Sequence, residues 1–125
     1  MRKNRLETEH YVAELKDGVL YVQFRPLLHI DLKSAEVIVK RRKEHFKDLP
    51  ISVLIKNEKV KSIDREARDY LFNEGLVNIN AVAFANVSEA DQVLVTFLLG
   101  LKSHRVPCET FVNEEEAVAW LQQYV

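Results

Sequence analysis

The stretch 10–24, HYVAELKDGVLYVQF, constrains the fold more than any other part of the sequence. Asp17-Gly18 suits a two-residue hairpin turn, because both central positions of such a turn take a positive φ. Side chains in a strand alternate between its two faces, so pairing around this turn places six apolar side chains on one face. The facing pairs are Leu15 with Leu20, Ala13 with Val22, and Tyr11 with Phe24. We therefore expect an antiparallel hairpin in this register.

Behind the hairpin, helical and strand-like patterns alternate along the chain. Apolar residues at helical spacing predict four helices, over 32–46, from about 64 to 72, over 89–102 and after Asn113. Short apolar runs predict strands at 51–55, 79–85 and 108–112. The predicted helix N-caps are Asp31, Ser62 or Asp64, Ser88 and Asn113. This order predicts an α/β fold: a five-stranded mixed, mostly parallel sheet with four helices and right-handed crossovers.

Length and composition favour one cytoplasmic domain over residues 1–125. Hydrophobic residues make up 47% and charged residues 30%, as in ordinary globular proteins. The net charge of −1 gives no field that favours nucleic acid. Cys108 is the one cysteine, so no intramolecular disulfide can form. The basic N-terminus lacks a following apolar segment, so no secretory signal is predicted. The longest apolar run, 93–101, is too short for a transmembrane segment.

Groupings that would indicate catalysis are not apparent. The histidines lie in separate segments without the spacing of a metal site, and the three glycines form no phosphate loop. We therefore predict a non-enzymatic protein without a metal or cofactor. The basic cluster KRRKEHFK at 40–47 contains Glu44 and lies on an amphipathic helix, which favours a solvated helix face over a nucleic-acid site. The four histidines are His10, His29, His45 and His104.

Three segments resemble the STAS family, in particular its short bacterial SpoIIAA-like members. They are the hairpin AELKDGVLYVQF, the segment KVKSIDREARDYL and the closing FVNEEEAVAWL. The resemblance extends over nearly the whole chain and implies a SpoIIAA/STAS-like fold. It also implies a small regulatory or interaction module that binds a protein partner or a second copy of itself.

The resemblance also directs attention to the start of the second predicted helix. Anti-sigma-factor antagonists of this family carry an Asp-Ser pair there, and a partner kinase phosphorylates the serine. Asp64 matches the aspartate, whereas Arg65 or Glu66 stands where the serine would be, and Ser62 lies two positions early. We therefore expect the shape of a partner site without the phosphoserine switch. The predicted partner-binding residues are Ser62, Asp64, Arg65, Glu66 and Arg68.

The predicted helix 89–102 is more apolar than a surface helix needs to be. Val95 and Leu99 extend its apolar stripe around the helix, and such a helix is buried or covered. The helix is therefore either part of the ordinary core or covered from outside. The cover would be a protein surface, including a second copy of the chain, a small apolar ligand or lipid, as in CRAL-TRIO-like domains, or a membrane surface. The residues predicted to form this interface or ligand wall are Val93, Leu94, Phe97, Leu98 and Leu101.

Overall fold

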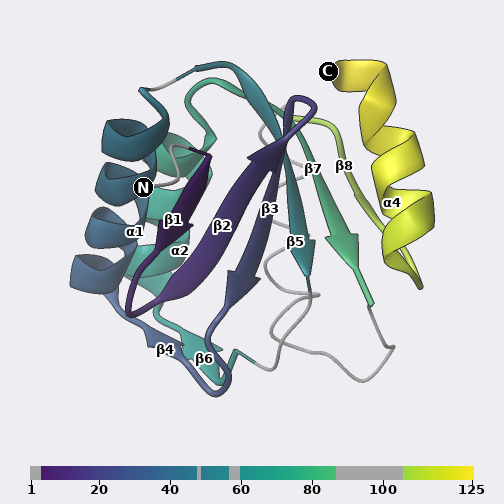
Figure 1. Ribbon diagram of the computed structural model, residues 1–125. Helices are drawn as coiled ribbons and strands as arrows, with labels where there is room; N and C mark the ends of the chain where they lie inside the picture. The colour runs from purple at the N-terminus through teal and green to yellow at the C-terminus, as the bar shows by residue number, and fades with distance from the viewer. Residues whose placement is uncertain (1–3, 48, 57–59, 87–105) are drawn as a thin grey trace.

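The computed structural model describes residues 4–47, 49–56, 60–86 and 106–125. Within these residues, six strands form one mixed sheet in the order β1-β2-β3-β5-β7-β8 (Figure 1). The pairs β1–β2 and β2–β3 are antiparallel, and the three pairs that follow are parallel. The predicted α/β class with a mostly parallel sheet is confirmed, although the sheet has six strands where five were predicted. The strands are β1 (Arg5–Glu7), β2 (Tyr11–Lys16), β3 (Val19–Phe24), β5 (Ile51–Lys56), β7 (Ile79–Ala85) and β8 (Cys108–Thr110).

The β2–β3 hairpin has the predicted register. Leu15 faces Leu20, and the pairs farther from the turn follow as expected. Asp17 has φ 51° and Gly18 has φ 82°, the pair of positive values that a type I′ turn requires. This turn therefore sets the register of the antiparallel half of the sheet.

The additional strand is β1, which pairs antiparallel with β2 and places Leu6 opposite Ala13. The turn between them is held by Thr8, whose hydroxyl oxygen accepts hydrogen bonds from the N–H groups of His10 (3.1 Å) and Tyr11 (3.0 Å). A strand of three residues has too little alternation to be distinguished in the sequence, which is why it was missed.

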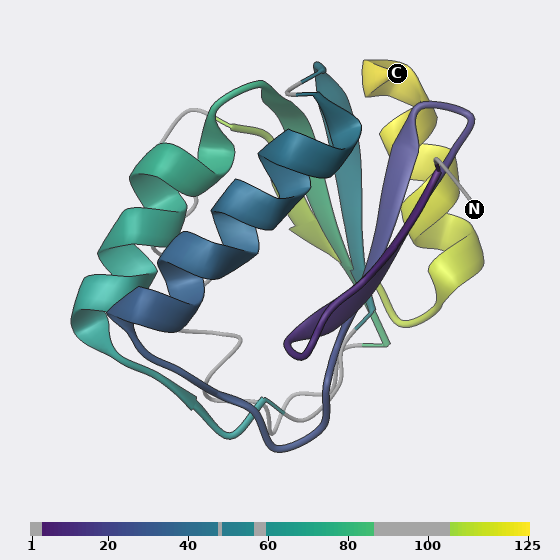
Figure 2. The same cartoon turned by 60° about the vertical axis from the view of Figure 1, so that its left-hand side comes forward.

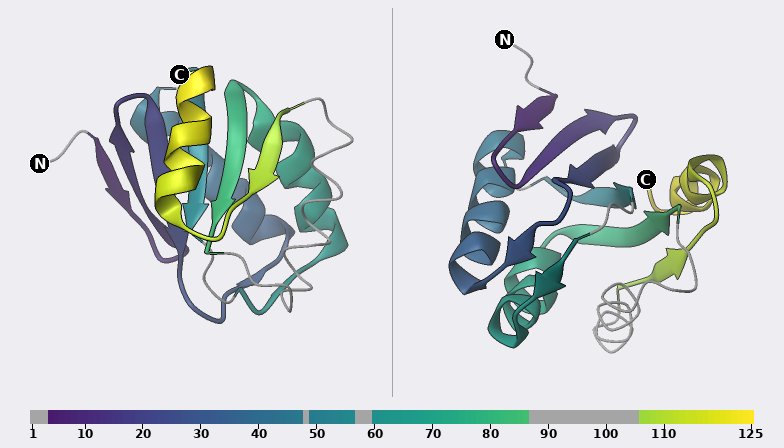
Figure 3. Two further views of the ribbon diagram at one scale, coloured as in Figure 1. Left: turned by 90° about the vertical axis from the view of Figure 1, so that its right-hand side faces the viewer. Right: turned by 90° about the horizontal axis from the view of Figure 1, so that it is seen from below.

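Helices cover both faces of the sheet. α1 (Leu32–Phe46) and α2 (Arg65–Asn73) lie side by side on one face, and α4 (Glu114–Leu121) packs on the other (Figures 2 and 3). Short 3-10 turns, η1 (Glu74–Leu76) and η2 (Gln122–Tyr124), follow α2 and α4. The predicted helix 89–102 lies outside the described residues.

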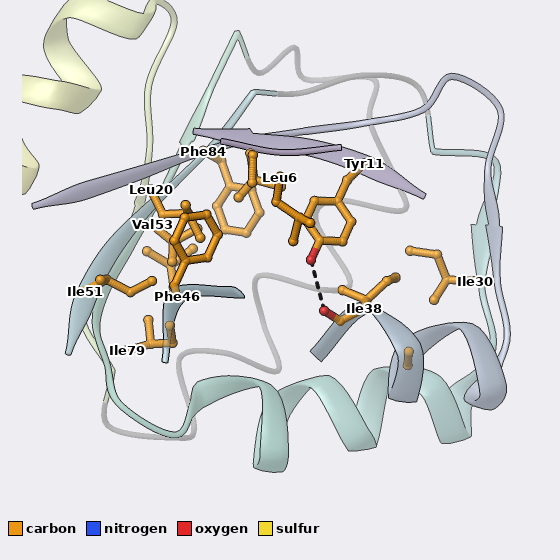
Figure 4. Close-up of a cluster of buried hydrophobic side chains, with 14 of the residues drawn as sticks. Leu6, Tyr11, Leu20, Ile30, Ile38, Phe46, Ile51, Val53, Ile79 and Phe84 are labelled. Carbon is orange, nitrogen blue, oxygen red and sulfur yellow. Dashed lines mark hydrogen bonds between the residues drawn. The ribbon is translucent and has the colours of Figure 1, made fainter. Parts of the chain in front are cut away.

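The larger part of the core lies between the sheet and the α1–α2 layer (Figure 4). Apolar residues of α1 and α2 meet the inner face of the hairpin and of the parallel strands. A second, alanine-rich cluster lies under α4 and allows that helix to approach β5 and β7 closely. Members labelled in Figure 4 include Leu6, Tyr11, Leu20, Ile38, Phe46, Val53 and Phe84.

α1 carries one charged residue into the interior. Arg42 belongs to the basic cluster 40–47, yet only 8% of its surface is exposed. Its Nη2 donates a hydrogen bond to the carbonyl oxygen of Gly75 (3.4 Å), which ties α1 to the turn after α2. The expected solvated face therefore holds for Lys40 and Arg41, which are exposed, and not for Arg42.

Candidate functional site

A two-stranded parallel ladder joins the segments that precede α1 and α2. It consists of β4 (His29–Ile30) and β6 (Ser62–Ile63), with His29 beside Ser62. Backbone bonds extend it: Lys61 N–H donates to Leu28 (2.8 Å), and Asp64 N–H donates to Ile30 (2.9 Å). Both helices therefore begin at the same end of the molecule, toward which the parallel strands point their carboxyl ends (Figure 1).

His29 is the centre of a polar cluster at this ladder. Its Nδ1 is hydrogen-bonded to the hydroxyl of Ser62, and its Nε2 lies 3.3 Å from Oδ1 of Asp64. A neutral imidazole satisfies both contacts in one tautomer, in which Nε2–H faces the carboxylate and Nδ1 accepts the serine proton. The side chains of His29 and Asp64 are 48% and 52% exposed, so the cluster is open to solvent on one side.

The two helix N-caps use their aspartates differently. The carboxylate of Asp31 accepts a hydrogen bond from the Ser34 N–H (2.7 Å), as predicted. That backbone bond, the Ser34 hydroxyl and the nearby His29 hold the pKa of Asp31 below its usual value. Asp64 occupies the N-cap position of α2, but its side chain makes no cap hydrogen bond and faces His29 instead.

The predicted partner-binding residues fall at this end of α2. Asp64 is the N-cap, so the alternative placement of Ser62 at the cap is wrong; Ser62 is a half-buried residue of β6. Arg65 and Glu66 are exposed in the first turn of the helix, and Arg68 is half-buried. These five residues are thus contiguous around the start of α2, whereas Val93, Leu94, Phe97, Leu98 and Leu101 lie outside the described residues.

His29 was not predicted to belong to this site. Its spacing from the other histidines indicated no grouping, and it lies 33 positions from Ser62 in the chain. A signal was present in two tripeptides, HID at 29–31 and SID at 62–64, each of which directly precedes a helix. The parallel ladder pairs the first two residues of each tripeptide, and the third residue of each is a helix N-cap.

The chemistry available at the site is that of a serine hydroxyl, an imidazole and a carboxylate connected in that order.

In the described part of the chain, no three histidine, cysteine or acidic side chains are grouped so that they could hold a metal ion. The described helices include none with the length and apolar character needed to cross a membrane. Cys108 is a half-buried residue of β8, in the six-stranded sheet and not in the β4–β6 ladder.

Comparison with known proteins agrees with the geometry. A solved structure described as an anti-sigma factor antagonist from Thermotoga maritima superposes with a TM-score of 0.62, at 18% identity, over 90% of this chain and 94% of that chain. At this identity the match concerns the fold alone, and it confirms the predicted STAS-like, SpoIIAA-like fold. None of the curated proteins matches the chain significantly. The family model described as "Domain of unknown function (DUF7793)" matches residues 13–125, and the chain therefore belongs to this family.

Proposed function

We propose that the chain is a small non-enzymatic regulatory module that binds a protein partner, or a second copy of itself, in the bacterial cytoplasm. The proposed contact surface, called the α2 surface below, consists of Ser62, Asp64, Arg65, Glu66 and Arg68 with the adjoining Leu27. The similarity in fold to a protein described as an anti-sigma factor antagonist supports an interaction role. The exposed charges around the start of α2 give such a surface its polar rim.

The observation that carries the proposal is the state of Leu27. This residue lies directly before Leu28, whose carbonyl oxygen accepts the hydrogen bond from Lys61 at the ladder. Its φ is 58°, a left-handed conformation that is strained by about 1–2 kcal/mol for a residue with a side chain. It is also 67% exposed to solvent. These two properties, backbone strain and an exposed apolar side chain near charged residues, are typical of a residue that anchors a protein partner.

We further propose that the family's phosphoserine switch is absent. Arg65 and Glu66 follow Asp64 in the first turn and carry no hydroxyl group. Ser62 lies in β6 rather than in the helix, and its hydroxyl is hydrogen-bonded to His29. Phosphosite mapping of the protein isolated from its own host tests this: phosphate on Ser62 would contradict it.

The test of the α2 surface uses two charge reversals on different parts of the same helical layer. Arg65→Glu changes the first turn of α2, and Arg41→Glu makes the same change at an exposed position in the later part of α1, away from the ladder. Leu27→Asn removes the apolar anchor while relieving its strain, since asparagine tolerates the left-handed region. We expect Arg65→Glu and Leu27→Asn to abolish partner retention or self-association, and Arg41→Glu to retain it.

Native mass spectrometry of the wild-type protein distinguishes self-association from the binding of a small ligand. A dimer at bare mass supports self-association, with Val93, Leu94, Phe97, Leu98 and Leu101 proposed as additional interface. A monomer that carries extra non-covalent mass would favour the alternative proposal, a module that binds a small apolar ligand or lipid. Equal retention by the wild type, Arg65→Glu and Leu27→Asn would refute the α2 surface.

A further inference from the structure

Ser62, His29 and Asp64 form a connected line of side chains with the connectivity of a serine nucleophile and its base. The hydroxyl of Ser62 meets Nδ1 of His29, and Nε2 of the same ring lies 3.3 Å from Oδ1 of Asp64. We infer that Ser62 is a reactive serine that accepts an acyl group from an activated ester or thioester, with His29 as general base. Ser62 and Asp64 also belong to the α2 surface, but the acylation needs no bound partner and goes beyond the proposed function.

The direction of proton transfer follows from the two contacts of the ring. With Nε2–H facing the carboxylate of Asp64, the free lone pair of His29 lies on Nδ1 and faces the hydroxyl of Ser62. The ring nitrogens are exchanged relative to the arrangement in serine proteases, but the roles are the same: one nitrogen takes the proton and the other is held by a carboxylate. The carboxylate also stabilises the imidazolium that forms.

The acylation step balances without a further reactant. The Ser62 oxygen attacks the carbonyl carbon of the acyl donor and forms a C–O bond, while its proton passes to Nδ1 of His29. The tetrahedral intermediate collapses, and the bond to the leaving group breaks with its electron pair on that group, a phenolate or a thiolate. His29 can then return the proton to the leaving group. Ser62 ends as an ester, with one acyl group per chain.

Two features of the fold support a chemical role over a purely structural contact. Asp64 stands at the N-cap of α2, yet its side chain serves His29 and not the first turn of the helix. The N–H groups of the first turn of α2 therefore lie close in sequence to Ser62 and donate no cap hydrogen bond to the Asp64 side chain. Such N–H groups, at the positive end of a helix, stabilise a developing oxyanion. The half-exposed side chains of His29 and Asp64 leave the cluster accessible to a donor.

The chain contains its own matched control in Ser34. This serine lies at the start of α1, as Ser62 lies just before the start of α2, but its backbone N–H and its hydroxyl both contact the carboxylate of Asp31. A carboxylate at that position, whose pKa is held low, is a poor base for a serine proton. Ser34 is therefore expected to stay unmodified under conditions that acylate Ser62.

The experiment exposes the full chain to p-nitrophenyl acetate and follows p-nitrophenolate release together with intact mass and peptide mapping after an acid quench. We expect one acetyl group, mapped to Ser62. Ser62→Ala should abolish it, His29→Gln should slow it by about 100-fold, and Asp64→Asn by about tenfold. Ser34→Ala should leave rate and site unchanged, and circular dichroism should show all four variants folded.

The pH dependence distinguishes a base from a structural contact. Only an unprotonated imidazole can take the Ser62 proton, so the wild-type rate should rise with pH, and His29→Gln should lack that rise. Should Ser62→Ala fail to fold, the comparison of His29→Gln with Ser34→Ala still decides the matter. Acetylation that maps to lysines or other histidines, or that proceeds equally in His29→Gln, would overturn the inference. It would not bear on the α2 surface, which Arg65→Glu and Leu27→Asn test separately.

Discussion

Replacing Tyr11 by phenylalanine should destabilise the protein at neutral pH and stabilise it at alkaline pH. Tyr11 is 2% exposed, and its hydroxyl donates a 3.1 Å hydrogen bond to the Ile38 carbonyl (Figure 4). Burial raises the pKa of Tyr11 from 10.0 to about 12, and the charges of Arg42 and Arg41 offset part of the rise. The neutral phenol is thus strongly preferred in the folded protein.

The sign of the pH effect follows from the raised pKa. Stability from the neutral phenol is fully present below pH 10, and it is lost as pH rises toward about 12, because the unfolded chain releases the proton first. The whole interval corresponds to about 3 kcal/mol, and about 2 kcal/mol of it is lost by pH 11.5. At pH 7 the Tyr11→Phe variant loses one buried hydrogen bond, which costs about 1 kcal/mol. The variant should therefore be less stable than the wild type at pH 7 and more stable at pH 11.5.

Urea unfolding at a series of pH values measures both curves. The two stability curves should cross between about pH 10 and 11, where the ionisation penalty of Tyr11 equals the free energy of the lost hydrogen bond. Val53→Ala is the control, because it removes buried apolar volume without a titrating group and should keep a constant deficit of about 2 kcal/mol. Arg42→Met should raise the pKa of Tyr11 further, since it removes a charge that lowers it. A Tyr11→Phe deficit that stays constant up to pH 11.5 would refute the reasoning.

Two further predictions concern the turn and the first helix cap. Gly18→Ala should destabilise the protein by about 1–3 kcal/mol, because the residue has φ 82° and its added Cβ would lie 2.3 Å from Cγ1 of Val125. Gly75→Ala is the control: the neighbours of its added Cβ are no nearer than 3.6 Å, so its free energy of unfolding should hardly change. Urea unfolding midpoints measure both variants. Asp31→Ala should weaken the loss of unfolding free energy at acid pH, because the lowered pKa of Asp31 contributes stability that is lost as pH falls. If the variant loses stability at acid pH as steeply as the wild type, the hydrogen bond from Ser34 does not contribute.

The sequence predicted the parts of the fold that repeat a period over many residues. The hairpin register followed from six alternating side chains and one turn dipeptide, and Asp31 and Asn113 cap their helices as expected. The short pairings β1–β2 and β4–β6 were missed, because strands of two or three residues carry no period and are held by backbone bonds to distant partners. The burial of Arg42 was equally hidden, since residue type alone places an arginine in water.

Of the candidate site, the sequence indicated the start of α2 and not its centre. Ser62 and Asp64 were named because a family resemblance directed attention to them. His29 was left out because its role depends on a contact across 33 positions, which neither spacing nor composition reveals. Only the paired tripeptides 29–31 and 62–64 carried that information, and they become meaningful once the two segments are known to be parallel neighbours.

The smallness of the β4–β6 ladder has a consequence for the order in which the molecule assembles. Bringing His29 to Ser62 closes a loop of 33 residues, with an entropic cost of about 3 kcal/mol, and a ladder of two residue pairs cannot offset that cost alone. The β2–β3 hairpin, by contrast, pairs neighbours in the chain and can form early. The serine–histidine contact should therefore arise only after α1 and α2 have packed on the sheet. Any molecule that recognises this contact would respond to completed folding and would ignore every partly folded form of the chain.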